Sequence, residues 1–166
     1  IGIKGARFEI SIAGTEISAD GADDVSFLFS ANPDEAPKPL ARVASGGELS
    51  RIMLVLKELI SKEEGGSVII FDEADSGIGG AVAETVGRKI KNLSRSCQVI
   101  CITHLPQVAK FADTHLLVTK TLEDKKTRVW VRSLGNEERV RELARMIGGI
   151  NVSEKTIEAA KEMLDG

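Results

Sequence analysis

Apolar and polar residues alternate in two stretches near the start of the chain. In ARFEISIAG, residues 6–14, the side chains of Phe8, Ile10 and Ile12 fall on one face, which is typical of a half-buried strand. VSFLFS, residues 25–30, repeats the alternation. The polar, glycine-containing stretch between them predicts a hairpin-like link. The proline-rich NPDEAPKPL that follows predicts an extended loop.

From residue 45 the apolar spacing changes to three and four residues, which predicts an amphipathic helix ending at KEEGG. Its expected apolar stripe comprises Leu49, Ile52, Met53, Leu56, Leu59 and Ile60. SVIIFDE, residues 67–73, contains four consecutive apolar residues, as in the middle of a parallel sheet. A helix over residues 79–93 and the apolar strand QVICIT then complete a βαβ unit with a right-handed crossover.

The rest of the chain predicts two strands and two helices. The strands, THLLVTK and TRVWVRSL, flank a charged turn. The first helix, NEERVRELARMIGG, is expected to begin at an Asn136 cap and to stop at its glycine pair. The second, SEKTIEAAKEML, is expected to be capped by Ser153. We therefore expect one α/β domain over residues 1–166, with a mostly parallel sheet flanked by helices and additional antiparallel strands.

Composition limits the classes of protein that this can be. A length of 166 residues suits one domain, and the leading Ile suggests a piece of a longer chain. No apolar run approaches the ~20 residues of a membrane span, so we expect a cytoplasmic protein without a membrane partner. Cys97 and Cys101 fit reduced, buried thiols better than metal ligands.

The formal charge of −3 gives the whole domain no nucleic-acid footprint. Local basic clusters fit solvated helix faces better than a phosphate-contacting patch. These clusters comprise Arg88, Lys89, Lys91, Arg95, Arg139, Arg141 and Arg145.

Two adjacent glycines, Gly46 and Gly47, stand where the helix should begin. Ser45 and Glu48 have the spacing of a capping box, so a well-capped helix is one reading. That reading does not explain the glycines, each of which costs ~1 kcal/mol relative to Ala inside a helix and less in the first turn. Glycine lets backbone N–H groups approach a ligand, and a helix N-terminus favours anions. A phosphate-binding helix start is the second reading.

Acidic residues and a histidine follow the two apolar strands. Asp72 and Glu73 would lie at the carboxyl end of a buried strand, where open α/β sheets bind ligands. Asp72 could hold Mg²⁺ through water, and Glu73 could orient or deprotonate a water for attack on phosphorus. His104 follows the neighbouring strand and could donate to a γ-phosphate. Each could instead be an ordinary strand end, and Asp75 could contact a partner's site or cap the next helix.

Taken together and in order, these motifs resemble the C-terminal half of an ABC-type P-loop ATPase head. ASGGE resembles the signature motif and VIIFDE resembles Walker B with its catalytic glutamate. Residues 74–77 fall at the D-loop, and the TH of CITH matches the switch histidine. The Glu that ends the signature motif points to the chromosome-maintenance and DNA-repair branch. Longer stretches resemble a bacterial DNA-repair member of this branch over residues 6–165, namely FLFSANPDEAPKPLARVASGGELSRIMLVLK, FDEADSGIGG, THLPQVA and RVRELARMIGG.

The resemblance implies an SMC-like ATPase for double-strand break repair and recombination, with ATP and Mg²⁺ as cofactors. Glu73 and His104 would be catalytic, Asp72 would hold Mg²⁺ through water, and Ser45, Gly46, Gly47, Glu48 and Asp75 would contact ATP. The P-loop pattern G-x-x-x-x-G-K-[ST] is absent. It would come from an N-terminal lobe beyond a coiled coil, so this piece alone should be inactive.

The implied partners are that N-terminal lobe, a second copy across an ATP sandwich, and DNA bound by the full-length protein. The implied location is the bacterial cytoplasm, in association with the nucleoid. Two alternatives remain open, namely a fragment of a membrane transporter's nucleotide-binding domain and a structural DNA clamp that does not hydrolyse ATP. The missing P-loop and Glu48 argue against the first, and Glu73 argues against the second.

Overall fold

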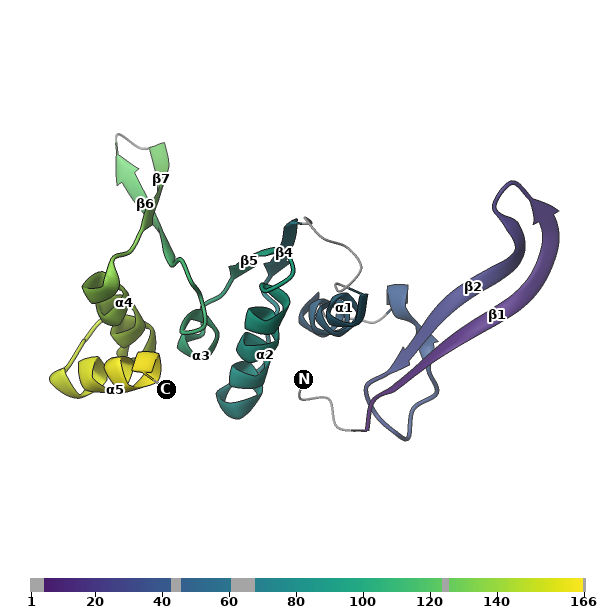
Figure 1. The fold of residues 1–166 in the computed structure, drawn as a ribbon, viewed down its shortest axis with the longest axis horizontal. Helices are drawn as coiled ribbons and strands as arrows, with labels where there is room; N and C mark the ends of the chain where they lie inside the picture. Colours follow the sequence, from purple (N-terminus) through teal and green to yellow (C-terminus); the bar gives the residue numbers. More distant parts are fainter. Residues whose placement is uncertain (1–4, 43–45, 61–67, 124–125, 166) are drawn as a thin grey trace.

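The computed structural model describes residues 5–42, 46–60, 68–123 and 126–165, with only the backbone of Glu123. Figure 1 shows the elements following one another along an elongated arrangement. In chain order they are β1 (Arg7–Ser18), β2 (Gly21–Ser30), β3 (Lys38–Pro39), the 3₁₀ helix η1 (Leu40–Arg42), α1 (Gly46–Ile60), β4 (Val68–Asp72), α2 (Gly80–Leu93), β5 (Gln98–Ile102), α3 (Pro106–Ala109), β6 (Leu116–Glu123), β7 (Lys126–Ser133), α4 (Asn136–Gly148) and α5 (Glu154–Asp165).

The first two predicted strands form a long antiparallel hairpin at one end of the molecule (Figure 1). Its strands are longer than predicted, because most of the polar stretch expected as a link belongs to β1 and β2. The expected apolar face is present, but the prediction that it is half-buried is wrong. Phe8, Ile10 and Ile12 are exposed, as are Val25 and Phe27 opposite them.

Helix α1 lies between this hairpin and the β4–β5 pair (Figure 1). The helix was predicted, and its expected end at KEEGG lies outside the described residues. Its buried face comprises Gly47, Arg51, Ile52 and Leu54. Only Ile52 of these belongs to the expected stripe, of which Leu49, Met53, Leu59 and Ile60 are exposed. Apolar residues of the helix therefore extend beyond the face that the described residues bury.

Strands β4 and β5 form the predicted parallel pair, with Ile70 opposite Ile100 and Asp72 opposite Ile102. One face of the pair packs with α2 and Leu54 of α1 in the main core. The expectation of a mostly parallel sheet holds for this pair alone. The other strand pairs of the described residues, β1–β2, β2–β3 and β6–β7, are antiparallel.

The C-terminal part contains the predicted β6–β7 hairpin and a second small core between α4 and α5. The short helix α3 was not predicted. The N-cap of α4 is Gly135 rather than Asn136, because the Gly135 N–H donates to the Glu138 carboxylate at 3.1 Å. Ser153 caps α5 as predicted, its Oγ accepting from the Thr156 N–H at 3.3 Å.

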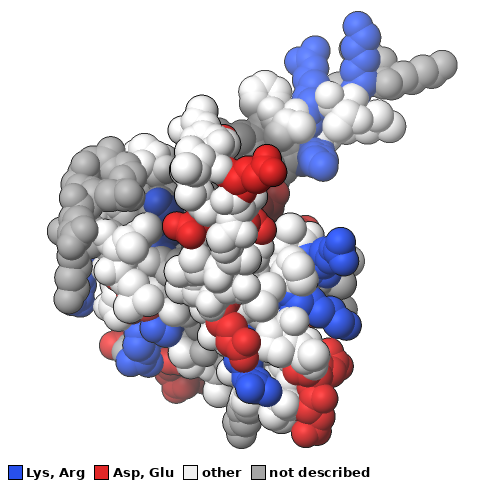
Figure 2. Space-filling view, turned by 90° about the vertical axis from the view of Figure 1, so that its right-hand side faces the viewer, with Lys and Arg blue, Asp and Glu red and all other residues white. Residues whose placement is uncertain are grey.

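Charged side chains of both signs are interspersed with broad uncharged areas on the face in Figure 2. The prediction of solvated helix faces holds for Arg88, which pairs with Glu84, and for Arg145, which pairs with Glu142. It is wrong for Arg139, which is half-buried and donates to the backbone carbonyls of Ala109 and Lys110. Both cysteines are free thiols, as expected. Across the described ranges, no helix combines the length and the apolar character needed to cross a bilayer.

Candidate functional site

The carboxyl ends of β4 and β5 form one edge, and three predicted site residues gather there. Asp72 ends β4 opposite Ile102, the last residue of β5, and His104 follows two residues later. Asp72 and Glu73 are exposed, and the side chain of His104 is 71% exposed. Parallel pairing therefore brings the acidic residues and the histidine to the same edge, as the sequence predicted. Their chemical roles stay predictions.

Glu73 has an unusual backbone conformation. Its φ is 52°, and among the described non-glycine residues Glu73 alone has a positive φ. This conformation costs of order 1–3 kcal/mol for a residue with a side chain. The turn that it begins is closed by the Ser76 N–H, which donates to the Glu73 carbonyl at 2.9 Å. Such strain is concentrated at functional sites. The carboxylate of Glu73 is thereby presented at the surface directly after a core strand.

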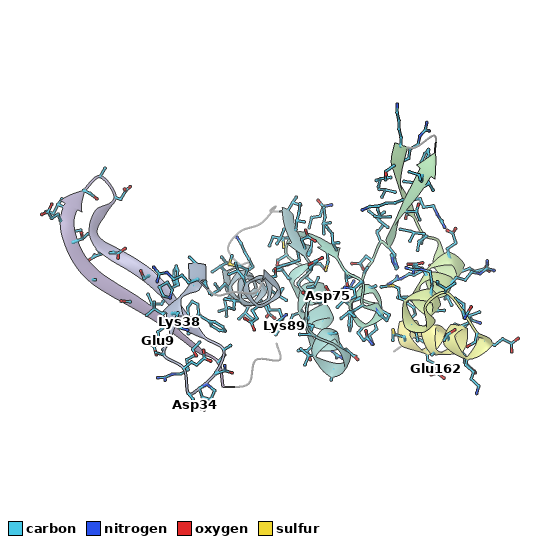
Figure 3. The ribbon with its side chains drawn as sticks, turned by 180° about the vertical axis from the view of Figure 1, so that it is seen from behind. Glu9, Asp34, Lys38, Asp75, Lys89 and Glu162 are labelled. Carbon is cyan, nitrogen blue, oxygen red and sulfur yellow. The ribbon has the colours of Figure 1, made fainter. Side chains whose placement is uncertain are left out.

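Asp75 lies in the middle of the molecule, at the junction between β4 and the loop that leads to α2 (Figure 3). It is 2% exposed, and its Oδ2 accepts a hydrogen bond from the Thr103 hydroxyl. The Nδ1 of His104 lies 3.6 Å from the same oxygen. The alternative that Asp75 caps α2 is wrong, because Gly79 occupies the N-cap. Its predicted contact with ATP stays a prediction.

The charge of Asp75 also affects a neighbouring thiol. Burial, together with the Asp75 carboxylate, raises the pKa of Cys101 to about 12. Cys101 is therefore a neutral thiol over the physiological pH range. Both thiols were expected to be buried, which holds for Cys97, whereas Cys101 is only half-buried.

The two glycines at the start of α1 have different surroundings. A Cβ on Gly47 would lie 2.8 Å from the Ser76 carbonyl oxygen, whereas a Cβ on Gly46 would meet nothing within 4 Å. Gly47 is thus required for close packing of α1 against the loop after Glu73. Gly46 is exposed, and its packing among the described residues does not require glycine. Ser45, and with it the expected capping box to Glu48, lies outside the described residues.

The structure adds Arg51 and Thr103, which the sequence reasoning did not single out. Arg51 is buried, and its Nη1 donates to the carbonyls of Ser76 at 3.0 Å and Ala74 at 3.5 Å. Arg51 thus fixes the loop to α1, and Thr103 contacts the same loop through Asp75. The sequence signal that could have identified Arg51 is its spacing. It lies four residues after Gly47 and three before Leu54, on a helix face whose other buried residues are uncharged.

The acidic residues at this edge can be compared with what a metal ion needs. Among the described residues, no group of three or more His, Cys, Asp or Glu side chains is arranged to hold a metal ion. Mg²⁺ commonly binds through one or two carboxylates, with waters and phosphate oxygens as its other ligands. Asp72, at an exposed strand end, could supply one such carboxylate.

Comparisons with known proteins give close sequence relatives. Curated proteins described as DNA repair protein RecN share 52% identity over 146 residues in Halalkalibacterium halodurans and 51% over 160 residues in Rickettsia felis. The RecN of Bacillus subtilis shares 48% over 149 residues. These alignments cover 88–96% of this chain but only 26–29% of the relatives. No protein-family model matches the chain.

Solved structures show the same fold. The Smc head domain from Pyrococcus yayanosii aligns with a TM-score of 0.59 at 24% identity, over 84% of this chain and 26% of that one. A chain from a study of ATP-driven dimerization and DNA-stimulated activation of SMC ATPases aligns with a TM-score of 0.52 at 21% identity, over 89% of this chain and 85% of that one. The mixed α/β arrangement is that of part of an SMC head.

Proposed function

The chain is a homologue of about a quarter of the DNA repair protein RecN, and from that premise we propose that it is the C-terminal lobe of an ABC-type ATPase head, forming a single unit over residues 1–166. The parent protein would hydrolyse ATP during repair of DNA double-strand breaks and recombination. It would act in the bacterial cytoplasm, in association with the nucleoid. The repair role is inferred from the curated relatives, and the ATPase activity is inferred from the SMC head fold.

The observation that carries this proposal is the gathering of Asp72, Glu73 and His104 at one sheet edge, with Glu73 held at a positive φ. Asp72 would hold Mg²⁺ through water, because a strand-end carboxylate suits a metal that also binds phosphate oxygens. Glu73 would orient the water that attacks the γ-phosphate. His104 would contact the γ-phosphate from the neighbouring strand.

The start of α1 would serve a second nucleotide, bound mainly by another copy of the head. Gly46, Gly47 and Ser45 would offer backbone N–H groups to its γ-phosphate, and the helix dipole favours the added charge. The opening left at Gly46 is consistent with such an approach. ATP would thus join two heads, and hydrolysis would release them, as in the ATP-driven dimerization described for SMC ATPases.

A further lobe of the same protein would cover the exposed apolar surfaces and bring the P-loop. The face of β4–β5 opposite α2 exposes Val68, Ile70, Ile100 and Ile102. Two grooves flank α1, one against β2 and one against β4, and they share Leu49. Apolar surface of this extent marks an interaction site. The roughly three quarters of each relative that this chain does not align with provides the length for such a lobe.

The proposal is tested by the mass of the complete protein in light scattering, with and without ATP. We expect ATP to double the mass of the parent. We expect Ser45→Arg to remain a monomer with ATP, because bulk and positive charge would block the helix start. Ser11→Arg, at an exposed polar position of β1, is the matched control and should still dimerise. ATP-driven dimers of Ser45→Arg would contradict the proposed sandwich.

A further inference from the structure

We propose that Asp75 is a positioning residue for His104, and that it ties the loop after β4 to the end of β5. The inference rests on the proposed function, since it gives His104 its task at the nucleotide. It departs from the role that the sequence suggested for Asp75, which was a contact to ATP. Asp75 would act through His104 and would not itself touch the nucleotide.

The burial of Asp75 supports an inward role. Its side chain is 2% exposed, whereas Asp72 and Glu73 beside it are exposed. Its Oδ1 is buried and has no hydrogen-bond partner among the described residues. An unpaired carboxylate oxygen in a core is costly, so its retention at this position calls for a gain elsewhere. The groups beside the other oxygen, Oδ2, indicate what that gain is.

Asp75 Oδ2 is shared by two consecutive residues at the end of β5. The Thr103 hydroxyl donates to it, and His104 Nδ1 lies 3.6 Å away. That separation is beyond a hydrogen bond but within the range of an ion pair, and such contacts often tighten when a ligand binds. A carboxylate at Nδ1 favours the proton on that nitrogen and fixes the ring. Nε2 is then the nitrogen left to face a phosphate.

The anchor for this arrangement is the loop itself. Arg51 donates to the carbonyls of Ala74 and Ser76, the residues on either side of Asp75. Gly47 allows the same loop to approach α1. Asp75 is therefore held at its backbone by α1 and acts with its side chain on β5. The start of α1 and the ring of His104 are connected through one loop of a few residues.

A double-mutant cycle on the complete protein tests this role, with kcat and KM for ATP as the readout. Asp75→Asn keeps the size and the hydrogen-bond acceptor but removes the charge beside Nδ1. We expect it to lower kcat about tenfold or more, because a displaced group loses its productive geometry, with KM within about twofold. In the His104→Ala background, Asp75→Asn should change kcat by less than about twofold, since the residue that it positions is gone.

Two further variants complete the test. Asp113→Asn neutralises an exposed carboxylate that pairs with Lys91 away from the site, and it should leave kcat unchanged. Thr103→Val retains the charge and removes the other partner of Oδ2. It should lower kcat less than Asp75→Asn and, again, only when His104 is present. If Asp75→Asn does not fold, Thr103→Val provides the test in its place.

The outcomes separate this inference from the proposed function. Equal losses from Asp75→Asn with and without His104 would show a merely structural residue and would overturn the inference, as would an unchanged kcat. Both results leave an ATPase standing. A parent protein without ATP turnover would overturn the proposed function and this inference together.

Discussion

The residues around the carboxyl end of β4 form two groups that differ in exposure. The exposed rim comprises Asp72, Glu73, His104 and Gly46, and the buried frame comprises Phe71, Ala74, Asp75, Arg51 and Gly47. Apart from His104, which follows β5, the two groups alternate along the end of β4, the residues after it and the start of α1. In the proposed function the rim carries the groups that would act on a phosphate, and the frame packs beneath the backbone next to them.

This difference separates two kinds of constraint that the sequence presents side by side. Gly46 and Gly47 are adjacent and chemically identical, yet one is open and the other packs against Ser76. Asp72 and Asp75 are three residues apart, yet one is exposed and the other buried. Substitutions in the frame should change the free energy of unfolding, and substitutions in the rim should change activity alone. The two stability comparisons below each set a frame residue against its neighbour in sequence.

The largest effect on stability is expected at Phe71. This side chain is 4% exposed in the main core, and we expect Phe71→Ala to lower the free energy of unfolding by about 3–5 kcal/mol. Its neighbour Ile70 points to the other face of β4 and is 64% exposed. Ile70→Ala should cost less than about 1 kcal/mol. Urea unfolding of this chain measures both.

The Phe71 comparison becomes sharper in the complete protein. If another lobe covers the outer face of β4–β5, Ile70→Ala should cost several times more there than in this chain alone, because a cavity forms. An Ile70→Ala cost that is the same in both proteins would contradict the covered face. Equal losses for Phe71→Ala and Ile70→Ala in this chain would contradict the core described above.

A smaller effect on stability is expected at the glycine pair. Gly47→Ala would place a Cβ 2.8 Å from the Ser76 carbonyl oxygen, and we expect this overpacking to cost about 1–3 kcal/mol. Gly46→Ala meets no neighbour and should stay within about 0.5 kcal/mol of the parent. Chemical denaturation of the two variants checks the difference. A Gly47→Ala protein as stable as Gly46→Ala would show that the contact with Ser76 is not tight.

The strands and helices with a strong apolar period were predictable from the sequence, and so was the edge that gathers Asp72, Glu73 and His104. A crossover helix makes the two strands parallel, so their carboxyl ends lie at the same edge of the sheet. Burial was predicted less well. The faces of β1–β2 and much of the α1 stripe carry apolar residues for contacts that the described residues do not make, so an apolar pattern did not indicate a covered surface.

The frame was hardest to predict, because it depends on packing between segments distant in sequence. Arg51 meets a loop more than twenty residues later along the chain, and Asp75 meets Thr103 at a similar separation. The residue type alone does not distinguish a buried Arg from a solvated one. The sequence presented Gly46 and Gly47 as one pair, whereas in the structure only Gly47 packs closely against Ser76.

The most direct test of the central claim is the rate of ATP hydrolysis by the complete protein carrying Glu73→Gln. We expect ATP binding and the unfolding midpoint to be retained and turnover to fall by a factor of about a hundred or more, because the amide cannot take a proton from the attacking water. Glu162→Gln, on the exposed face of α5 (Figure 3), is the control and should hydrolyse ATP like the parent. Turnover of Glu73→Gln within twofold of the parent would contradict the account.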